Sequence, residues 1–132
     1  MWTCPVCERD LLRDNQWHIC VKADLDSLFE GKPKELEFMF DKILAEVVEW
    51  DGVIVSNTKK CILFVHRQTF LVIRPMSQFL DLQFYSKAEL PCPPFLKSKK
   101  VSKKFENHFR INRLEEVSPF LIKHLRDSYE LL

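Results

Sequence analysis

Residues 53–85 read VIVSNTKKCILFVHRQTFLVIRPMSQFLDLQFY, and they constrain the architecture more than any other part of the chain. Apolar and polar residues follow a two-residue period in four short runs, which is typical of strands. The runs lie at 53–55, 61–65, 69–73 and 79–85. Asn57-Thr58-Lys59-Lys60 makes a good hairpin connection between the first two runs. Four short strands in succession predict an antiparallel meander.

A helical pattern precedes the meander. Pro33 suits the first turn of a helix that extends to about residue 50, where Asp51-Gly52 ends it. Its apolar residues recur at three- and four-residue steps, which marks one buried face. They are Leu36, Met39, Phe40, Ile43, Val47 and Trp50. Asp24 is suited to cap a shorter helix through about residue 29, closed by Gly31.

The segment after the meander is harder to interpret. Residues 91–104 begin with Pro-Cys-Pro-Pro and continue with lysines, which predicts a long, exposed and mobile connection. Residues 105–113 alternate as a fifth strand, and Ser118-Pro119 begins a C-terminal helix. We therefore predict an α+β fold: an approximately five-stranded, mainly antiparallel sheet with two N-terminal helices and one C-terminal helix.

The first twenty residues contain a set of metal-ligand side chains. Cys4-Pro5-Val6-Cys7 forms a close thiol pair, and His18-Ile19-Cys20 follows after ten intervening residues. Four-coordinate structural zinc prefers thiolates and imidazoles in two such pairs. Two residues apart, His18 and Cys20 share a face only in an extended segment. We predict one structural zinc on Cys4, Cys7, His18 and Cys20, held by a small hairpin segment at 1–22 that precedes the α+β domain at 23–132.

Other interpretations of the cysteines remain open. The four residues could be ordinary buried thiols and a surface histidine. A disulfide between Cys4 and Cys7 is disfavoured because nothing marks the chain as secreted. A redox motif would follow a strand within a βαβ pattern, which is absent. A catalytic zinc would need an open coordination position, and four candidate ligands leave none.

Composition places the chain among ordinary globular domains. Its length of 132 residues is enough for one domain with a small appendage. Its hydrophobic content of 46% is normal for a globular protein, and its formal net charge is +1. Residues 21–52 sum to −5 and residues 97–113 to +6, so a local basic patch is predicted. No apolar run matches a membrane span, and no signal peptide is recognisable. Cys61 and Cys92 read as free thiols, and we expect a cytoplasmic protein without membrane contact.

Short motifs along the chain resemble a known bacterial family. They are 2–7 (WTCPVC), 15–20 (NQWHIC), 40–43 (FDKI), 62–64 (ILF), 70–75 (FLVIRP) and 108–111 (HFRI), with the Leu125 and Tyr129 spacing of the last helix. The chain is similar to the family named domain of unknown function 5655. No activity is assigned to that family, so the resemblance implies the domain boundary and the zinc ligands and nothing about chemistry.

Basic residues near the C-terminal end suggest nucleic-acid binding. The cations Lys97, Lys99, Lys100, Lys103, Lys104 and Arg110 could neutralise phosphates. The overall charge near zero and the lack of aromatic residues between the lysines weaken this prediction. A solvated lysine loop is the simpler alternative.

A second candidate is a protein or small-ligand site on the sheet. His66, Arg74 and His108 could share one face with Tyr85 and Arg110, although the register cannot be deduced from sequence. A merely solvated sheet face is the simpler alternative here too.

Catalytic motifs are missing from the sequence. No nucleophile elbow or phosphate-binding glycine loop occurs. Cys61 and His66 would point to opposite faces of one strand, and the proline-rich surroundings of Cys92 offer nothing that would activate its thiol. We therefore predict a non-catalytic binding module rather than an enzyme, with nucleic acid or another protein as its partner.

Overall fold

The computed structural model describes residues 2, 3, 5, 10, 11 and 28–132. Its main feature is an open six-stranded sheet, antiparallel throughout, with the order β3-β4-β5-β6-β8-β7. The strands are β3 (Ile54–Asn57), β4 (Ile62–Val65), β5 (Thr69–Pro75), β6 (Leu80–Ser86), β7 (Lys97–Val101) and β8 (Lys104–Ile111). A separate two-stranded antiparallel pair joins β1 (Trp2–Thr3) to β2 (Asp10–Leu11).

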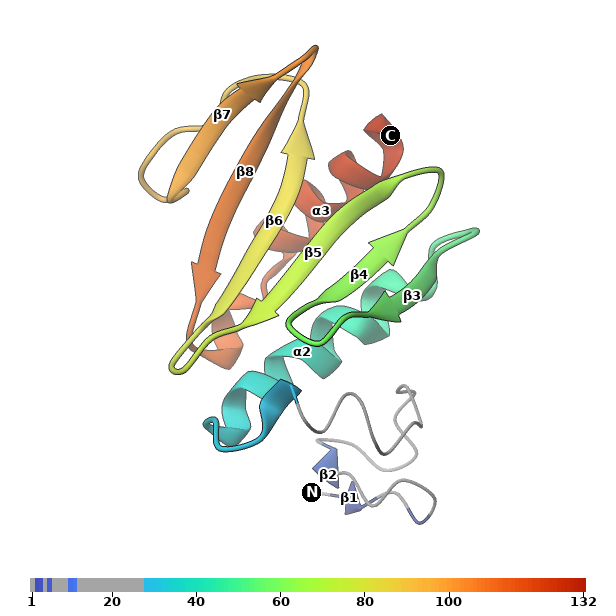
Figure 1. Cartoon of the computed structure of the whole chain (residues 1–132), viewed down its shortest axis with the longest axis vertical. Coiled ribbons are helices and arrows are strands. Elements are labelled where there is room, and N and C mark those ends of the chain that lie inside the picture. The colour runs from blue at the N-terminus through green and yellow to red at the C-terminus, as the bar shows by residue number, and fades with distance from the viewer. Residues whose placement is uncertain (1, 4, 6–9, 12–27) are drawn as a thin grey trace.

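The described helices lie on one side of the sheet. Both α2 (Lys34–Val47) and α3 (Pro119–Leu131) lie behind it in Figure 1, and the face toward the viewer carries no described helix. A short 3₁₀ turn, η1 (Leu114–Glu116), connects β8 to α3. The described residues therefore form a two-layer α+β arrangement, in which helices cover one face of the sheet and no described helix covers the other.

The hydrophobic core fills the space between sheet and helices. Alternate strand residues point into it, and its largest fully buried aromatic side chains are Phe40, Phe64, Phe70 and Phe84. Phe70 and Leu71 are both fully buried because the β4–β5 register shifts at Phe64/Val65. From α2 the core receives Leu36, Met39, Phe40, Ile43, Leu44 and Val47. The predicted apolar face of this helix is confirmed except that Trp50 lies in the turn after it.

The C-terminal helix begins where the sequence predicts. Ser118 has extended backbone angles, its hydroxyl accepts a hydrogen bond from Leu121 N, and Pro119 occupies the first turn. Later in α3, the buried Ser128 hydroxyl donates to Phe70 O and accepts from Tyr85 N. This helix is thus hydrogen-bonded directly to β5 and β6.

The prediction of a long, mobile connection over residues 91–104 is wrong, because the strand β7 forms within it. The main sheet therefore has six strands instead of the predicted five. Phe95 is only 3% exposed and packs against Phe84 and Phe109, so the chain is held at the core just before β7. The Ser98 hydroxyl donates to Asn107 Oδ1 at 2.6 Å across the β7–β8 pair. Lysine is common on edge strands, where it discourages pairing with other chains.

Two predicted features lie wholly or largely outside the described residues. The zinc-binding segment is one, because Cys4, Cys7, His18 and Cys20 are not described. The short helix predicted from Asp24 is the other, although residues 28 and 29 are helical. In the part of the chain that is described, no helix is long and apolar enough to cross a membrane.

Gly52 offers a test of local packing. Its φ is +74°, and a Cβ there would lie 3.0 Å from His66 Cδ2. Gly31 has a similar φ of +72°, but its Cβ would meet nothing within 4 Å. We expect Gly31→Ala to lower the free energy of unfolding by about 1 kcal/mol through backbone strain alone. Gly52→Ala should lower the free energy of unfolding by clearly more than this, because its Cβ would also press against His66. Urea unfolding of both variants measures the difference, and equal losses of stability would contradict the contact with His66.

Candidate functional site

The sheet face that points away from α2 and α3, here called the open face, gathers most of the polar side chains of the central strands. Strand alternation and register assign its residues. On β7, β8 and β6 they are Lys97, Lys99, Val101, Lys104, Glu106, His108, Arg110, Asp81, Gln83 and Tyr85. On β5, β4 and β3 they are Val72, Arg74, Leu63, Val65, Ile54 and Ser56. The polar half therefore lies over β6, β8 and β7, and the aliphatic half over β3 and β4.

Asp81 links two of the predicted site residues. Its Oδ2 lies 3.4 Å from His108 Nδ1 and 3.8 Å from Arg74 Nη1. Arg74 Nη1 also donates to Gln83 Oε1 at 3.0 Å. Because β5, β6 and β8 are neighbours, residues far apart in sequence form one connected polar group on the open face.

His108 engages a second carboxylate. Its Nε2 lies 3.2 Å from Glu106 Oε1, while its Nδ1 faces Asp81. A neutral imidazole carries one N–H and can donate to only one of them, whereas an imidazolium can donate to both. Both carboxylates of the open face are thus already in contact with basic side chains.

The remaining charges of the open face are cations. They are Arg74, Lys97, Lys99, Lys104 and Arg110, against the two carboxylates Asp81 and Glu106. The face therefore carries an excess of positive charge on a chain whose total is only +1. Such a distribution attracts anionic partners to one side of the molecule.

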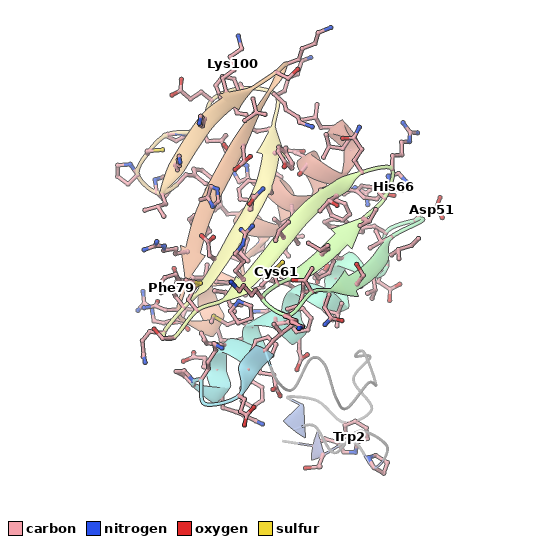
Figure 2. All side chains as sticks on the ribbon, viewed as in Figure 1. Trp2, Asp51, Cys61, His66, Phe79 and Lys100 are labelled. Carbon is pink, nitrogen blue, oxygen red and sulfur yellow. The ribbon has the colours of Figure 1, made fainter. Side chains whose placement is uncertain are left out.

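Two aromatic rings accompany these cations. Lys104 Nζ lies 4.6 Å from the centre of the Tyr85 ring, and the Arg110 guanidinium lies 4.4 Å from that of Phe79. Phe79 is labelled in Figure 2 at the β5–β6 turn. The sequence shows no aromatic residue among the lysines. The two rings come instead from β6 and the turn before it, which lie earlier in the chain. Only the β6–β8 register could have revealed them.

The predicted lysine set divides between two sides of the sheet. Lys97, Lys99 and Lys104 belong to the open face together with Arg110. Lys100 pairs with Phe105 and so points to the opposite side, and Lys103 lies in the turn between β7 and β8. Figure 2 labels Lys100 near that end of the hairpin. The residues form a β-hairpin instead of the mobile loop that the sequence suggests.

His66 does not join Arg74 and His108. It follows β4 in the turn toward β5, and its ring stacks on Tyr129 of α3 with centroids 4.5 Å apart. Figure 2 shows it near Asp51, well away from the β8 side of the sheet. The prediction that these three residues share one face is therefore wrong for His66, because the bulge and turn at this end direct its ring toward α3.

His124 lies on the helix side, among aromatic rings. Its ring centroid is 4.8 Å from that of Phe120 and 5.0 Å from that of Phe95. Burial lowers the pKa of His124 below its usual value of 6.5, Asp127 partly opposes this, and Lys123 adds to it. The ring of His124 therefore packs among aromatic side chains of the helix side and is not part of the open face.

Most of the chain matches a known protein family. The family described as Domain of unknown function (DUF5655) matches residues 25–132. The chain belongs to this family. The matched part includes the complete six-stranded sheet with α2 and α3, and it begins after the Cys/His segment. No curated protein and no solved structure shows significant similarity to the chain.

Candidate metal ligands do not cluster among the described residues. Across residues 2–3, 5, 10–11 and 28–132, no group of three or more His, Cys, Asp or Glu side chains could hold a metal ion. The predicted ligands Cys4, Cys7, His18 and Cys20 lie outside the described residues. The zinc site therefore stays a prediction from the sequence.

Proposed function

We propose that the protein is a non-catalytic binding module whose open face binds single-stranded nucleic acid. One observation carries the proposal: five lysine and arginine side chains share this face with only two carboxylates, of which Asp81 already contacts His108 and Arg74 and Glu106 already contacts His108. Apart from Arg74, which pairs with Asp81, these cations form no ion pair within the described residues, so phosphates could approach them without displacing a carboxylate.

The arrangement of the cations supports a backbone contact. Neighbouring strands lie about 4.8 Å apart, so Lys97 and Lys99 on β7 and Lys104 and Arg110 on β8 form two adjacent rows. A strand laid along these rows would bring several phosphates near ammonium or guanidinium groups. Contacts of this kind give affinity that falls with salt and depends little on sequence.

The aromatic side chains favour a single strand. Base stacking on an aromatic side chain contributes about 1–3 kcal/mol per base and tolerates any base. Tyr85, beside Lys104, could receive an unpaired base in place of its ammonium contact. Among the described residues, no helix lies on the open face to enter the groove of a duplex.

The proposal is tested with one triple variant and one double variant of the same hairpin. Binding of a fluorescent mixed-sequence single-stranded oligonucleotide is measured across a salt series. In Lys97→Ser/Lys99→Ser/Lys104→Ser, we expect binding to weaken and the slope of log K against log salt to fall by about 0.7 for each lost phosphate contact. The control Lys100→Ser/Lys103→Ser removes lysines that do not belong to the open face, and it should bind nearly as the unmodified protein does.

Three results would overturn the proposal. The first is no binding of the unmodified protein at low salt. The second is equal weakening in the triple variant and the control, which would indicate a diffuse charge effect. The third is tighter binding of the corresponding duplex, which would require a different mode of contact.

A protein partner is the second candidate, and the aliphatic half of the open face favours it. Ile54 on the edge strand β3 is 64% exposed, and Leu63 and Val65 beside it are half-buried. Exposed apolar side chains gathered on one face are typical of protein contacts. The uncharged replacement Ile54→Gln should then abolish capture of that partner while leaving oligonucleotide binding unchanged.

We also propose that Cys4, Cys7, His18 and Cys20 bind one structural zinc. The support is the donor set itself, three thiols and an imidazole in two close pairs. A segment of this length cannot bury a core of its own, so a metal would stabilise it.

A further inference from the structure

A cleft between the two helices has features of a ligand site. Its volume is about 530 Å³, and it lies where the second half of α2 faces the first half of α3. Lys42 and Glu46 come from α2, and Ile122, Lys123 and Arg126 come from α3. Pockets of about 300–1,000 Å³ are typical of small-molecule sites. This cleft is on the covered side of the sheet, so it is independent of the open face.

The apolar lining of the cleft is firmly held. Trp50, Val117, Pro119 and Ile122 contribute to it. The Trp50 ring packs against Tyr129 with centroids 5.3 Å apart and against Phe70 at 6.2 Å. A half-buried indole supported in this way presents a rigid ring surface to a ligand at little conformational cost.

Arg126 brings charge to this ring surface. Its guanidinium carbon lies 5.3 Å from the Trp50 ring centre and 4.9 Å from that of Tyr129, and its Nε donates to Glu130 Oε1 at 2.8 Å. Stacking and this hydrogen bond together fix the plane of the guanidinium. Within residues 28–132, its Nη1 and Nη2 have no hydrogen-bond partner. Two parallel N–H donors suit a planar carboxylate.

The rim of the cleft favours an anion as well. Among the lining residues, three cations, Lys42, Lys123 and Arg126, stand against one carboxylate, Glu46, while Glu130 outside the lining pairs with Arg126 Nε. The cleft thus combines an aromatic and aliphatic lining with a cationic rim. We propose that it binds a small aromatic carboxylate, whose ring packs on Trp50 and Ile122 while its carboxylate pairs with Arg126.

The test uses 2-naphthoate as the probe. Binding is followed by the Trp50 indole signal in an NMR titration, assigned by its loss in Trp50→Phe because the chain has three tryptophans. We expect saturable shifts with a Kd of about 1 mM or tighter, as for a ligand of this size. The uncharged analogue 2-naphthalenemethanol has the same ring system and should bind about tenfold more weakly.

Two variants separate the guanidinium from charge in general. Arg126→Lys keeps the charge but loses the planar donor pair, and we expect it to weaken binding about tenfold. Lys60→Gln removes an exposed lysine in the turn between β3 and β4, and it should leave the Kd unchanged. Each variant is checked first for an intact NMR spectrum.

Several outcomes would overturn this assignment. One is the absence of saturable shifts at about 10 mM probe, far above the expected Kd. Another is equal binding of 2-naphthoate and its alcohol, which would remove the role of the carboxylate. A third is a folded Arg126→Lys variant that binds as tightly as the unmodified protein. The oligonucleotide assay is unaffected by any of these results, because it reports on the opposite face.

Discussion

Ser128→Ala is expected to lower the free energy of unfolding by about 2–3 kcal/mol, through loss of two buried hydrogen bonds. The Ser128 hydroxyl donates to Phe70 O at 2.7 Å and accepts from Tyr85 N at 3.0 Å, and the residue is fully buried. The β5–β6 ladder ends at the pair Leu71 and Phe84, so this hydroxyl bridges the next two residues where the strands separate. Alanine would leave a carbonyl and an N–H unpaired inside the protein.

Urea unfolding of Ser128→Ala beside Ser56→Ala would measure this effect. Ser56 is exposed on the edge strand β3, and its replacement should change stability by no more than about 0.5 kcal/mol. The same bridge positions the backbone of Tyr85, so Ser128→Ala should also broaden or shift the NMR signals of Tyr85 and Lys104. A loss below about 1 kcal/mol would mean that water replaces the hydroxyl, and the proposed role of Ser128 would be wrong.

Periodicity was sufficient to predict the central part of the fold. The alternating runs at 53–85 correspond to β3, β4, β5 and β6, with ends displaced by one or two residues. The start of α3 is predictable from two neighbouring residues, a serine N-cap followed by proline. This pair favours a helix start largely independently of tertiary contacts. Long amphipathic segments such as α2 are predictable for the same reason.

The strand β7 could not be predicted, and the reason is physical. Its sequence Lys-Ser-Lys-Lys-Val has no buried face, so no hydrophobic alternation marks it. It forms because Phe95 is held in the core just before it and Asn107 on β8 accepts a hydrogen bond from Ser98. Both contacts join residues through the tertiary structure, which a pattern within one segment does not contain.

The candidate site was only partly predictable. The cationic residue types were visible in the sequence, but which of them share a face depends on register. The sequence alone therefore groups Lys100 with Lys99, although the two side chains lie on opposite sides of the sheet. Asp81, which joins Arg74 to His108, was not recognised at all, since a single aspartate in a strand has no distinguishing sequence signal.

If the proposed zinc site is correct, the unmodified protein holds one zinc ion per chain, and Cys7→Ala and His18→Ala are each expected to lower that content to near none. A tetrahedral site that loses one of its four ligands binds zinc far more weakly, and the thiolates that remain no longer close the loop. Zinc content is measured by mass spectrometry of the metal after gel filtration. Cys61→Ala and Cys92→Ala are the controls, because these thiols belong to the folded domain and lie outside the predicted ligand set; both should retain full zinc.

The same variants distinguish a structural metal from an incidental one. Within the part of the chain that the structure describes, residues 28–132 supply a continuous hydrophobic core, so we expect the sheet and both described helices to keep their NMR signals when zinc is lost. Signals of the first twenty residues should collapse toward random-coil positions, because so short a segment has no core of its own. Full zinc content in both Cys7→Ala and His18→Ala would remove these ligands from the assignment. Loss of zinc without any change in the N-terminal signals would instead show that the ion binds there but does not hold the segment together.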